Sequence, residues 1–303
     1  MTGLREDLNV RRMPLALVAV ALFVAVLGTG SAAAYPVAHN ERESRENVIR
    51  YWTSDRMRQA LPPQRASRPL AAKAAKGGGT TAATSTEVPQ PYPSTYGKVF
   101  FTSNSGVNYV CSGTAIASAN ESLVWTAGHC VNEGPGAFYK NFLFVPAYRD
   151  GVAPYGKFAG TTLLTTSGWQ ASGEWGVDVG AAIVGLSGSG QTLSDAVSEA
   201  NLVFNAPRNQ AYRLYGYPAA KKFSGQRMRI CQTSWLTDDT SATPDTMGAS
   251  CDMTGGSSGG AWVTSTGAVA SVVSYGYSSL RNVLFGPRLE SEAQSLYAAA
   301  SAG

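Results

Sequence analysis

The sequence predicts an all-β domain, because short runs rich in Val, Tyr, Phe and Thr recur through its second part. Gly, Pro, Ser and Asn separate these runs, a spacing typical of a β-barrel or a β-sandwich. Residues 92–303 are long enough to form one large domain with a substantial core. The expected strands are residues 98–102, 107–116, 123–126, 142–148, 158–165, 177–184, 211–217, 227–231, 261–264 and 268–275. Gly286-Pro287 then breaks the pattern, and residues 290–300 have helical composition.

Residues 1–34 carry the pattern of a secretory signal peptide. Arg5, Arg11 and Arg12 precede a run of thirteen apolar residues, 15–27, and small residues follow at 31–34. Thirteen apolar residues are too few to span a bilayer comfortably. We therefore expect export and cleavage near residue 34, with an uncleaved anchor as the alternative. The arginine pair also allows twin-arginine export, although the Met-Pro that follows it is a poor match to that signal.

The segment between the signal and the domain differs from both in composition. Residues 35–76 are rich in arginine, and the run from Val48 to Leu61 predicts a short amphipathic helix that Pro62-Pro63 ends. Residues 77–93 have the Gly/Thr/Ser/Pro composition of a linker. Residues 1–90 hold 12 Lys/Arg and 7 Asp/Glu, whereas residues 91–303 hold 12 and 13. The domain therefore carries no large positive charge that would indicate binding to nucleic acid.

Residues 254–260 read Thr-Gly-Gly-Ser-Ser-Gly-Gly between two apolar runs. Glycines at such a turn expose a serine hydroxyl and leave backbone N–H groups facing the same point, which is what attack on an acyl carbon needs. An ordinary Gly/Ser loop is the alternative. A serine nucleophile also needs a base, and the chain has only two histidines. His39 lies in the polar front segment, so His129 is the candidate within the domain.

Thr126-Ala127-Gly128-His129-Cys130, followed far downstream by Gly-x-Ser-Gly-Gly at residues 256–260, resembles the chymotrypsin/trypsin-like serine endopeptidases. The similarity is closest to secreted bacterial members, including the glutamyl-endopeptidase-like branch, and covers roughly residues 92–286. It implies two six-stranded antiparallel β-barrels with the site in the cleft between them, and a C-terminal helix. It also implies that residues 35–91 are a propeptide with a flexible linker, for which a disordered arm is the alternative.

The resemblance assigns a role to each residue of a catalytic site. It implies that Ser258 is the nucleophile, His129 the base and Asp178 the acid that orients the imidazole. Gly256 and Ser258 would supply the oxyanion-binding N–H groups. Asp178 falls 49 residues after His129, directly before an apolar strand. Its rivals are Asp150, in an Arg-Asp-Gly turn, and Glu174.

All four cysteines lie in the domain, which in an exported chain suggests two disulfides. The resemblance implies a bridge between Cys111 and Cys130, next to the histidine, and Cys231 then pairs with Cys251. We expect no metal site and no cofactor, because the domain holds a single histidine and no convincing metal-ligand spacing.

The sequence constrains the substrate specificity less than it constrains the catalytic residues. Asp252 stands six residues before Ser258, the offset at which trypsin-like enzymes carry the acid that binds Arg or Lys at P1. Glutamyl-endopeptidase-like relatives also carry an acid near this place, and their Glu-selective pockets use a histidine that residues 273–276 lack. An acid that bonds nearby backbone beside Cys251 is a third reading. Ser274, Tyr275 and Gly276 resemble the strand that binds the substrate backbone.

Together these features predict a secreted serine endopeptidase made as a precursor, monomeric, acting on protein or peptide substrates with a possible Arg/Lys preference. We expect no lasting membrane association after the signal is cleaved. A catalytically silent protease-like binding module is the main alternative. An esterase with the same three residues is a weaker one, because α/β-hydrolases place the histidine last.

Overall fold

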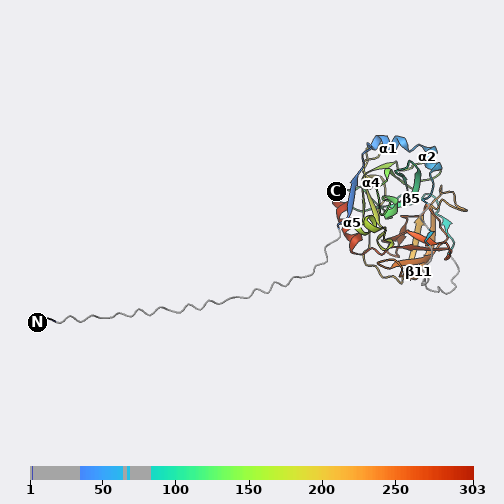
Figure 1. Cartoon of the computed structure of the whole chain (residues 1–303). Helices are drawn as coiled ribbons and strands as arrows, with labels where there is room; N and C mark the ends of the chain where they lie inside the picture. The colour runs from blue at the N-terminus through green and yellow to red at the C-terminus, as the bar shows by residue number, and fades with distance from the viewer. Residues whose placement is uncertain (1, 3–34, 64–66, 69–82) are drawn as a thin grey trace. The chain divides into compact units, whose positions relative to one another are not determined.

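The structure is a computed structural model that describes residues 2, 35–63, 67–68 and 83–303 (Figure 1). Apart from Thr2, the expected signal peptide lies outside the described residues, as do residues 64–66 and 69–76 of the arginine-rich segment and residues 77–82 of the expected linker. None of the helices in the described ranges has both the length and the apolar content that crossing a membrane requires.

The first barrel is a closed antiparallel barrel of six strands. The order β7-β4-β5-β6-β9 is closed by β8, which pairs with both β7 and β9. The strands bury large side chains such as Phe100 and Trp125, which are fully inaccessible to solvent. The strands are β4 (Tyr96–Thr102), β5 (Asn108–Ile116), β6 (Leu123–Thr126), β7 (Lys140–Pro146), β8 (Phe158–Thr165) and β9 (Gly180–Val184).

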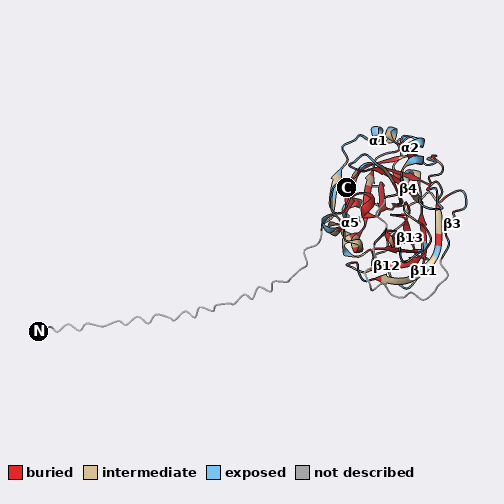
Figure 2. Cartoon of the chain, turned by 45° about the vertical axis from the view of Figure 1, so that its right-hand side comes forward, coloured by how far each residue is buried: buried red, intermediate tan, exposed pale blue. Residues whose placement is uncertain are grey.

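The second barrel is a half-barrel, in the strand order β14-β13-β10-β11-β12-β16-β15. All six pairings along this path are antiparallel. Figure 2 shows that the strands of both barrels are largely buried. The strands are β10 (Ala211–Gly216), β11 (Arg229–Asp239), β12 (Thr246–Ser250), β13 (Ala261–Val263), β14 (Val269–Val272), β15 (Tyr275–Tyr277) and β16 (Val283–Gly286). The predicted all-β, two-barrel fold is thereby confirmed.

Helices are short and peripheral. The predicted C-terminal helix is confirmed as α5 (Ser291–Ala302), which buries Leu296 and Ala300 and contacts β9. The other helical segments of the domain are α3 (Ser167–Ser172), α4 (Leu193–Ala196) and the 3₁₀ turns η1 (Gly128–Cys130) and η2 (Trp175–Val177).

The sequence pattern does not predict strands β12 and β16. Every residue of both is buried, so neither shows the alternation of apolar and polar residues that marks a half-exposed strand. Gly248 of β12 lets the Phe285 ring of β16 approach, since an added Cβ would lie 2.7 Å from that ring. The predicted strand 177–184 begins later, at Gly180, because residues 175–177 form η2.

The front segment packs against the first barrel rather than standing apart from it. β1 (Val37–Asn40) adds to β8 in antiparallel pairing, and α1 (Arg45–Tyr51) and α2 (Ser54–Gln59) follow (Figure 1). Trp52, between the two helices, is fully buried, 5.3 Å from the Phe100 ring, and donates its indole N–H to the Asn141 carbonyl at 2.7 Å. The predicted amphipathic helix is thus two short helices whose apolar residues enter the barrel's core cluster.

After α2, the front segment contacts β5 of the first barrel and then strands of the second barrel. Leu61 exchanges backbone hydrogen bonds with Asn108 and Val110 at 3.0 and 2.8 Å, and β2 (Ser67–Arg68) pairs in parallel with β15. β3 (Thr86–Glu87) pairs with β11, and Val88 and Tyr92 are buried. Residues 83–91, at the end of the expected flexible linker, therefore lie on the second barrel.

Candidate active site

His129 is positioned by the end of strand β6. The strand stops at Thr126, and η1 turns the chain so that the His129 ring lies inside, only 2 % exposed. The next residue, Cys130, forms a disulfide with Cys111 on β5, with 6.2 Å between the two Cα atoms. Because this bridge ties η1 to the barrel wall, it fixes the histidine relative to the strands around it.

Asp178 lies against His129, fully buried. Its Oδ2 is 2.7 Å from His129 Nδ1, and its Oδ1 accepts the His129 backbone N–H at 2.8 Å. The Ser274 hydroxyl also donates to Oδ2. A Cβ on Gly128 would lie 2.9 Å from Oδ1, so glycine permits this close approach. The carboxylate is therefore held by three donors, and two of them belong to His129.

The two rival acids lie in other settings. Asp150 sits in a partly buried turn and forms an ion pair with Arg227 at 2.9 Å. Glu174 accepts the backbone N–H groups of Gly176 and Thr243. Neither makes a contact with His129 among the described residues.

The Ser258 turn lies next to the end of β6. Gly256 and Gly259 have φ values of +97° and +78°, which favour glycine, and a Cβ on Gly259 would collide with Thr126 Oγ1 at 2.0 Å. The Ser258 carbonyl accepts the Ser112 N–H at 2.7 Å, and the Gly259 N–H donates to the Val273 carbonyl at 2.7 Å. Since Ser274 follows Val273, the turn is joined to the residue that contacts Asp178.

The hydroxyls of the two adjacent serines are used differently. Ser257 Oγ donates to the Thr254 carbonyl at 2.7 Å, within its own turn. Among the described residues, Ser258 Oγ has no such partner and makes no hydrogen bond with the His129 ring, and the backbone N–H groups of Gly256 and Ser258 donate to no acceptor. Within the described part of the chain, Ser258 therefore carries the unengaged hydroxyl of the two serines.

Asp252 follows Cys251, whose disulfide with Cys231 spans 5.8 Å between Cα atoms. Its Oδ1 accepts the Ser85 N–H at 2.7 Å, and its Oδ2 pairs with Lys222 Nζ at 2.8 Å. Burial by itself would raise the pKa of Asp252, but the hydrogen bonds from Lys222 and Ser85 lower it below its usual range. The carboxylate is thus ionised, and both its oxygens are engaged within the chain.

The strand expected to bind substrate is β15 and the residue before it, and it borders two residues that sequence analysis did not single out. Trp175 places its ring 6.2 Å from His129 and 5.0 Å from Tyr275. Asp239, at the end of β11, accepts the hydroxyls of Tyr275 and Tyr277. Trp175 could have been noticed in the sequence, because it stands three residues before Asp178. No local pattern points to Asp239, because the tyrosines that bind it lie far away in the sequence.

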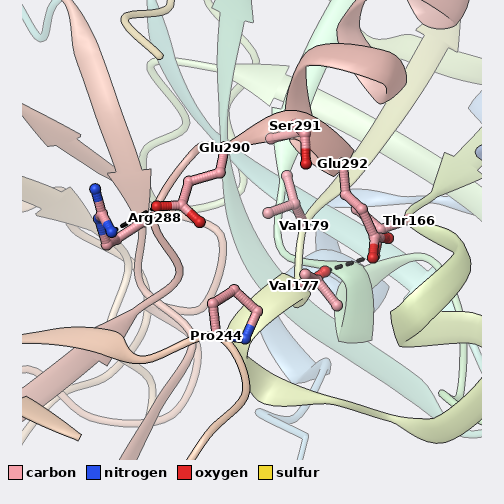
Figure 3. Close-up of a pocket in the computed structure, with 9 residues that line it drawn as sticks. Thr166, Val177, Val179, Pro244, Arg288, Glu290, Ser291 and Glu292 are labelled. Carbon is pink, nitrogen blue, oxygen red and sulfur yellow. Dashed lines mark hydrogen bonds and ion pairs between the residues drawn. The ribbon is translucent and has the colours of Figure 1, made fainter. Parts of the chain in front are cut away.

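The pocket in Figure 3 lies behind the Asp178 segment and not at the candidate site. Val177 and Val179, on either side of Asp178, line this cavity of about 90 Å³ together with residues at the start of α5. Thr166 donates to the Val177 carbonyl at 2.5 Å, and Arg288 and Glu290, which also line the cavity, form an ion pair at 2.5 Å. The Thr166 hydrogen bond holds the backbone directly before Asp178.

No protein-family model and no curated protein sequence matches the chain. Solved structures do match. The protease Anisep from Arthrobacter nicotinovorans is 43 % identical, with a TM-score of 0.66, over 70 % of this chain and 97 % of its own. A thermostable serine protease, AL20, from an extremophilic microorganism is 41 % identical, with a TM-score of 0.65, over 69 % and 97 %. A Glu endopeptidase shares the fold at 21 % identity and a TM-score of 0.59, over 74 % and 98 %.

Proposed function

Because the chain belongs to the bacterial chymotrypsin-like serine proteases, we propose that it is a secreted endopeptidase using Ser258, His129 and Asp178 as its catalytic triad. The observation that carries the triad is the Asp178 carboxylate, buried and bonded to both the ring and the backbone of His129. The Ser258 turn is joined by backbone hydrogen bonds to the same group of segments.

The chemistry follows from these positions. Ser258 attacks the peptide carbonyl carbon while His129 takes the hydroxyl proton, and the Asp178 carboxylate stabilises the imidazolium that forms. The N–H groups of Gly256 and Ser258 receive the oxyanion. His129 then protonates the leaving amine, and a water molecule, activated by the same ring, hydrolyses the acyl-enzyme.

We further propose that residues 1–34 are a cleaved signal peptide and residues 35–91 a propeptide that covers the cleft. Two close approaches support a propeptide that covers the cleft. A Cβ on Gly255, in the nucleophile turn, would lie 3.2 Å from Pro62, and Ser67 pairs with Gly276 of β15. A backbone that pairs with β15 occupies the edge that a substrate backbone needs. The two disulfides fit an extracellular protein.

Active-site labelling tests this function. We expect a fluorophosphonate to modify the mature protein once per chain at Ser258, and to modify a His129→Ala variant far more slowly, because the hydroxyl then lacks its base. Mass spectrometry of the labelled peptide identifies the site. Labelling without cleavage of any peptide would indicate an esterase, and no labelling of the mature protein would indicate a silent binding module.

A preference for Arg or Lys at P1 depends on Asp252 becoming available. In this structure its two oxygens bind Ser85 and Lys222. Ser85 belongs to the segment proposed for removal, and the Lys222 side chain is 64 % exposed, so both contacts are replaceable. We therefore propose that Asp252 contacts a basic P1 residue only after maturation.

For mature protein, we expect Asp252→Asn to lower kcat/KM for a P1-Arg peptide by roughly 10–100-fold, because a charge-assisted bond is lost. The matched P1-Gln peptide should change little. Competition assays with the two peptides measure this ratio, and Lys222→Gln is the control that should leave the Arg preference intact or increase it. An unchanged ratio in Asp252→Asn would rule out this role.

A further inference from the structure

Two aromatic residues of β15 hold the Asp239 carboxylate through their hydroxyl groups. Asp239 is only 3 % exposed, and its Oδ2 accepts the Tyr275 hydroxyl at 2.6 Å and the Tyr277 hydroxyl. Its Oδ1 accepts the backbone N–H and the hydroxyl of Ser241 at 3.0 and 2.6 Å. The carboxylate is thus held in one orientation by donors from two segments.

These donors also set its charge. Burial alone would raise the pKa of Asp239, but the hydrogen bonds from Ser241, Tyr275 and Tyr277 lower it below its usual range. Asp239 is therefore ionised at neutral pH. The structure places a buried negative charge at the hydroxyl ends of two tyrosines, whose rings lie 5.7 Å apart and perpendicular to one another.

The cluster adjoins the catalytic site. Trp175, which is partly exposed, lies between them, with its ring 5.0 Å from Tyr275 and 6.2 Å from His129. Aromatic faces attract cations through their quadrupole, and a carboxylate at the same place adds a full charge. Negative groups and aromatic faces together are the chemistry that selects a guanidinium or an ammonium.

A segment of the chain itself already pairs with β15 beside this cluster. β2 pairs with β15 so that Ser67 stands opposite Gly276 and Arg68 opposite Tyr277. With β2 in place, Tyr275 and Tyr277 are 1 % and 6 % exposed. The residue that the chain itself places in register with Tyr277 is therefore an arginine.

From this geometry we infer that Asp239, Tyr275, Tyr277 and Trp175 form a specificity subsite for an Arg or Lys side chain, separate from the P1 site. A substrate backbone paired with β15 would bring one of its side chains to this cluster, whose tyrosines stand one and three residues after Ser274. The inference rests on the proposed protease function, and it identifies a substrate class: peptides with a basic residue away from the cleaved bond.

Matched peptides measure the subsite. A fixed P1 residue is kept, and each other position is occupied in turn by arginine or by its neutral analogue citrulline. We expect one position at which the mature protease prefers arginine. Asp239→Asn should lower the arginine/citrulline ratio of kcat/KM at that position about tenfold or more, chiefly through KM. The neighbouring acid provides a control: Asp238→Asn, whose carboxylate binds Trp235 and Arg208, should keep the ratio.

A second variant checks that a lower ratio in Asp239→Asn is not caused by misfolding. Tyr277→Phe keeps the ring but removes one donor to Asp239, so it should reduce the ratio by less than Asp239→Asn does. The subsite would be overturned if the parent protease cleaved the arginine and citrulline peptides with the same kcat/KM at every position. It would also be overturned if neither variant lowered the parent's preference for arginine. Fluorophosphonate labelling separates this result from a failure of the proposed function, since an active protease without the subsite still labels and still cleaves the citrulline peptides.

Discussion

Replacing Ser258 by alanine is expected to lower the kcat of peptide cleavage by about 10⁵–10⁶-fold, because no other group takes over as nucleophile. Ser257→Ala should retain most of the activity, since its hydroxyl bonds the Thr254 carbonyl within the turn. This pair of variants is well matched: the two residues are adjacent, and both are buried.

Steady-state kinetics on mature protein measure both variants, with thermal unfolding as the check on folding. The proteins should unfold at similar temperatures, because each substitution removes a single oxygen atom. If Ser257→Ala lost activity as completely as Ser258→Ala while remaining folded, the choice of nucleophile would be wrong. If Ser258→Ala retained full activity, the acyl-enzyme mechanism itself would fail.

The second large effect concerns how the front segment is held. Trp52→Ala is expected to weaken docking of residues 45–60 by about 3–5 kcal/mol, the usual cost of removing a large buried aromatic side chain. The indole packs on Phe100 and bonds the Asn141 carbonyl, so both the packing and one hydrogen bond are lost. The barrel should keep its own stability, because its strands pair without Trp52.

Hydrogen exchange on the full chain measures this loss, in a Ser258→Ala background that prevents self-cleavage. Amides of residues 45–60 should exchange roughly 100-fold faster or more, as expected from that free energy. Arg50→Ala, an exposed change on α1, is the matched control. In the chain with Ser258 intact, Trp52→Ala should also speed fluorophosphonate labelling of the precursor. Unchanged protection would show that Trp52 does not hold the segment.

The strands and the helix whose bounds were predicted closely have strong local patterns in the sequence. β6 and β8 have the bounds that their apolar runs predict, and α5 begins one residue after the predicted start. β12 and β16 lack such a signal, because both are short and buried along their whole length, so neither shows an alternation of apolar and polar residues. Their pairing is decided by contacts with each other, far apart along the chain.

The front segment shows the same limit. Apolar spacing and Pro62-Pro63 predict a single helix where the structure has two, and they do not predict the attachment of the segment to both barrels. β1 adds to β8 across more than a hundred residues, and β2 adds to β15 across about two hundred. Backbone pairing of this kind depends on a free strand edge, which no local pattern reveals.

The sequence by itself determined the chemistry: a Ser/Gly turn, a single histidine in the domain, an acid before an apolar strand and four cysteines. These are short patterns whose meaning comes from residue type and spacing. Only the tertiary structure decided that Asp178 meets His129, that Ser85 and Lys222 engage Asp252, and that Asp239 lies beneath the tyrosines of β15. Each of these contacts joins residues that folding alone brings together, so their geometry is a property of the barrels rather than of any local stretch.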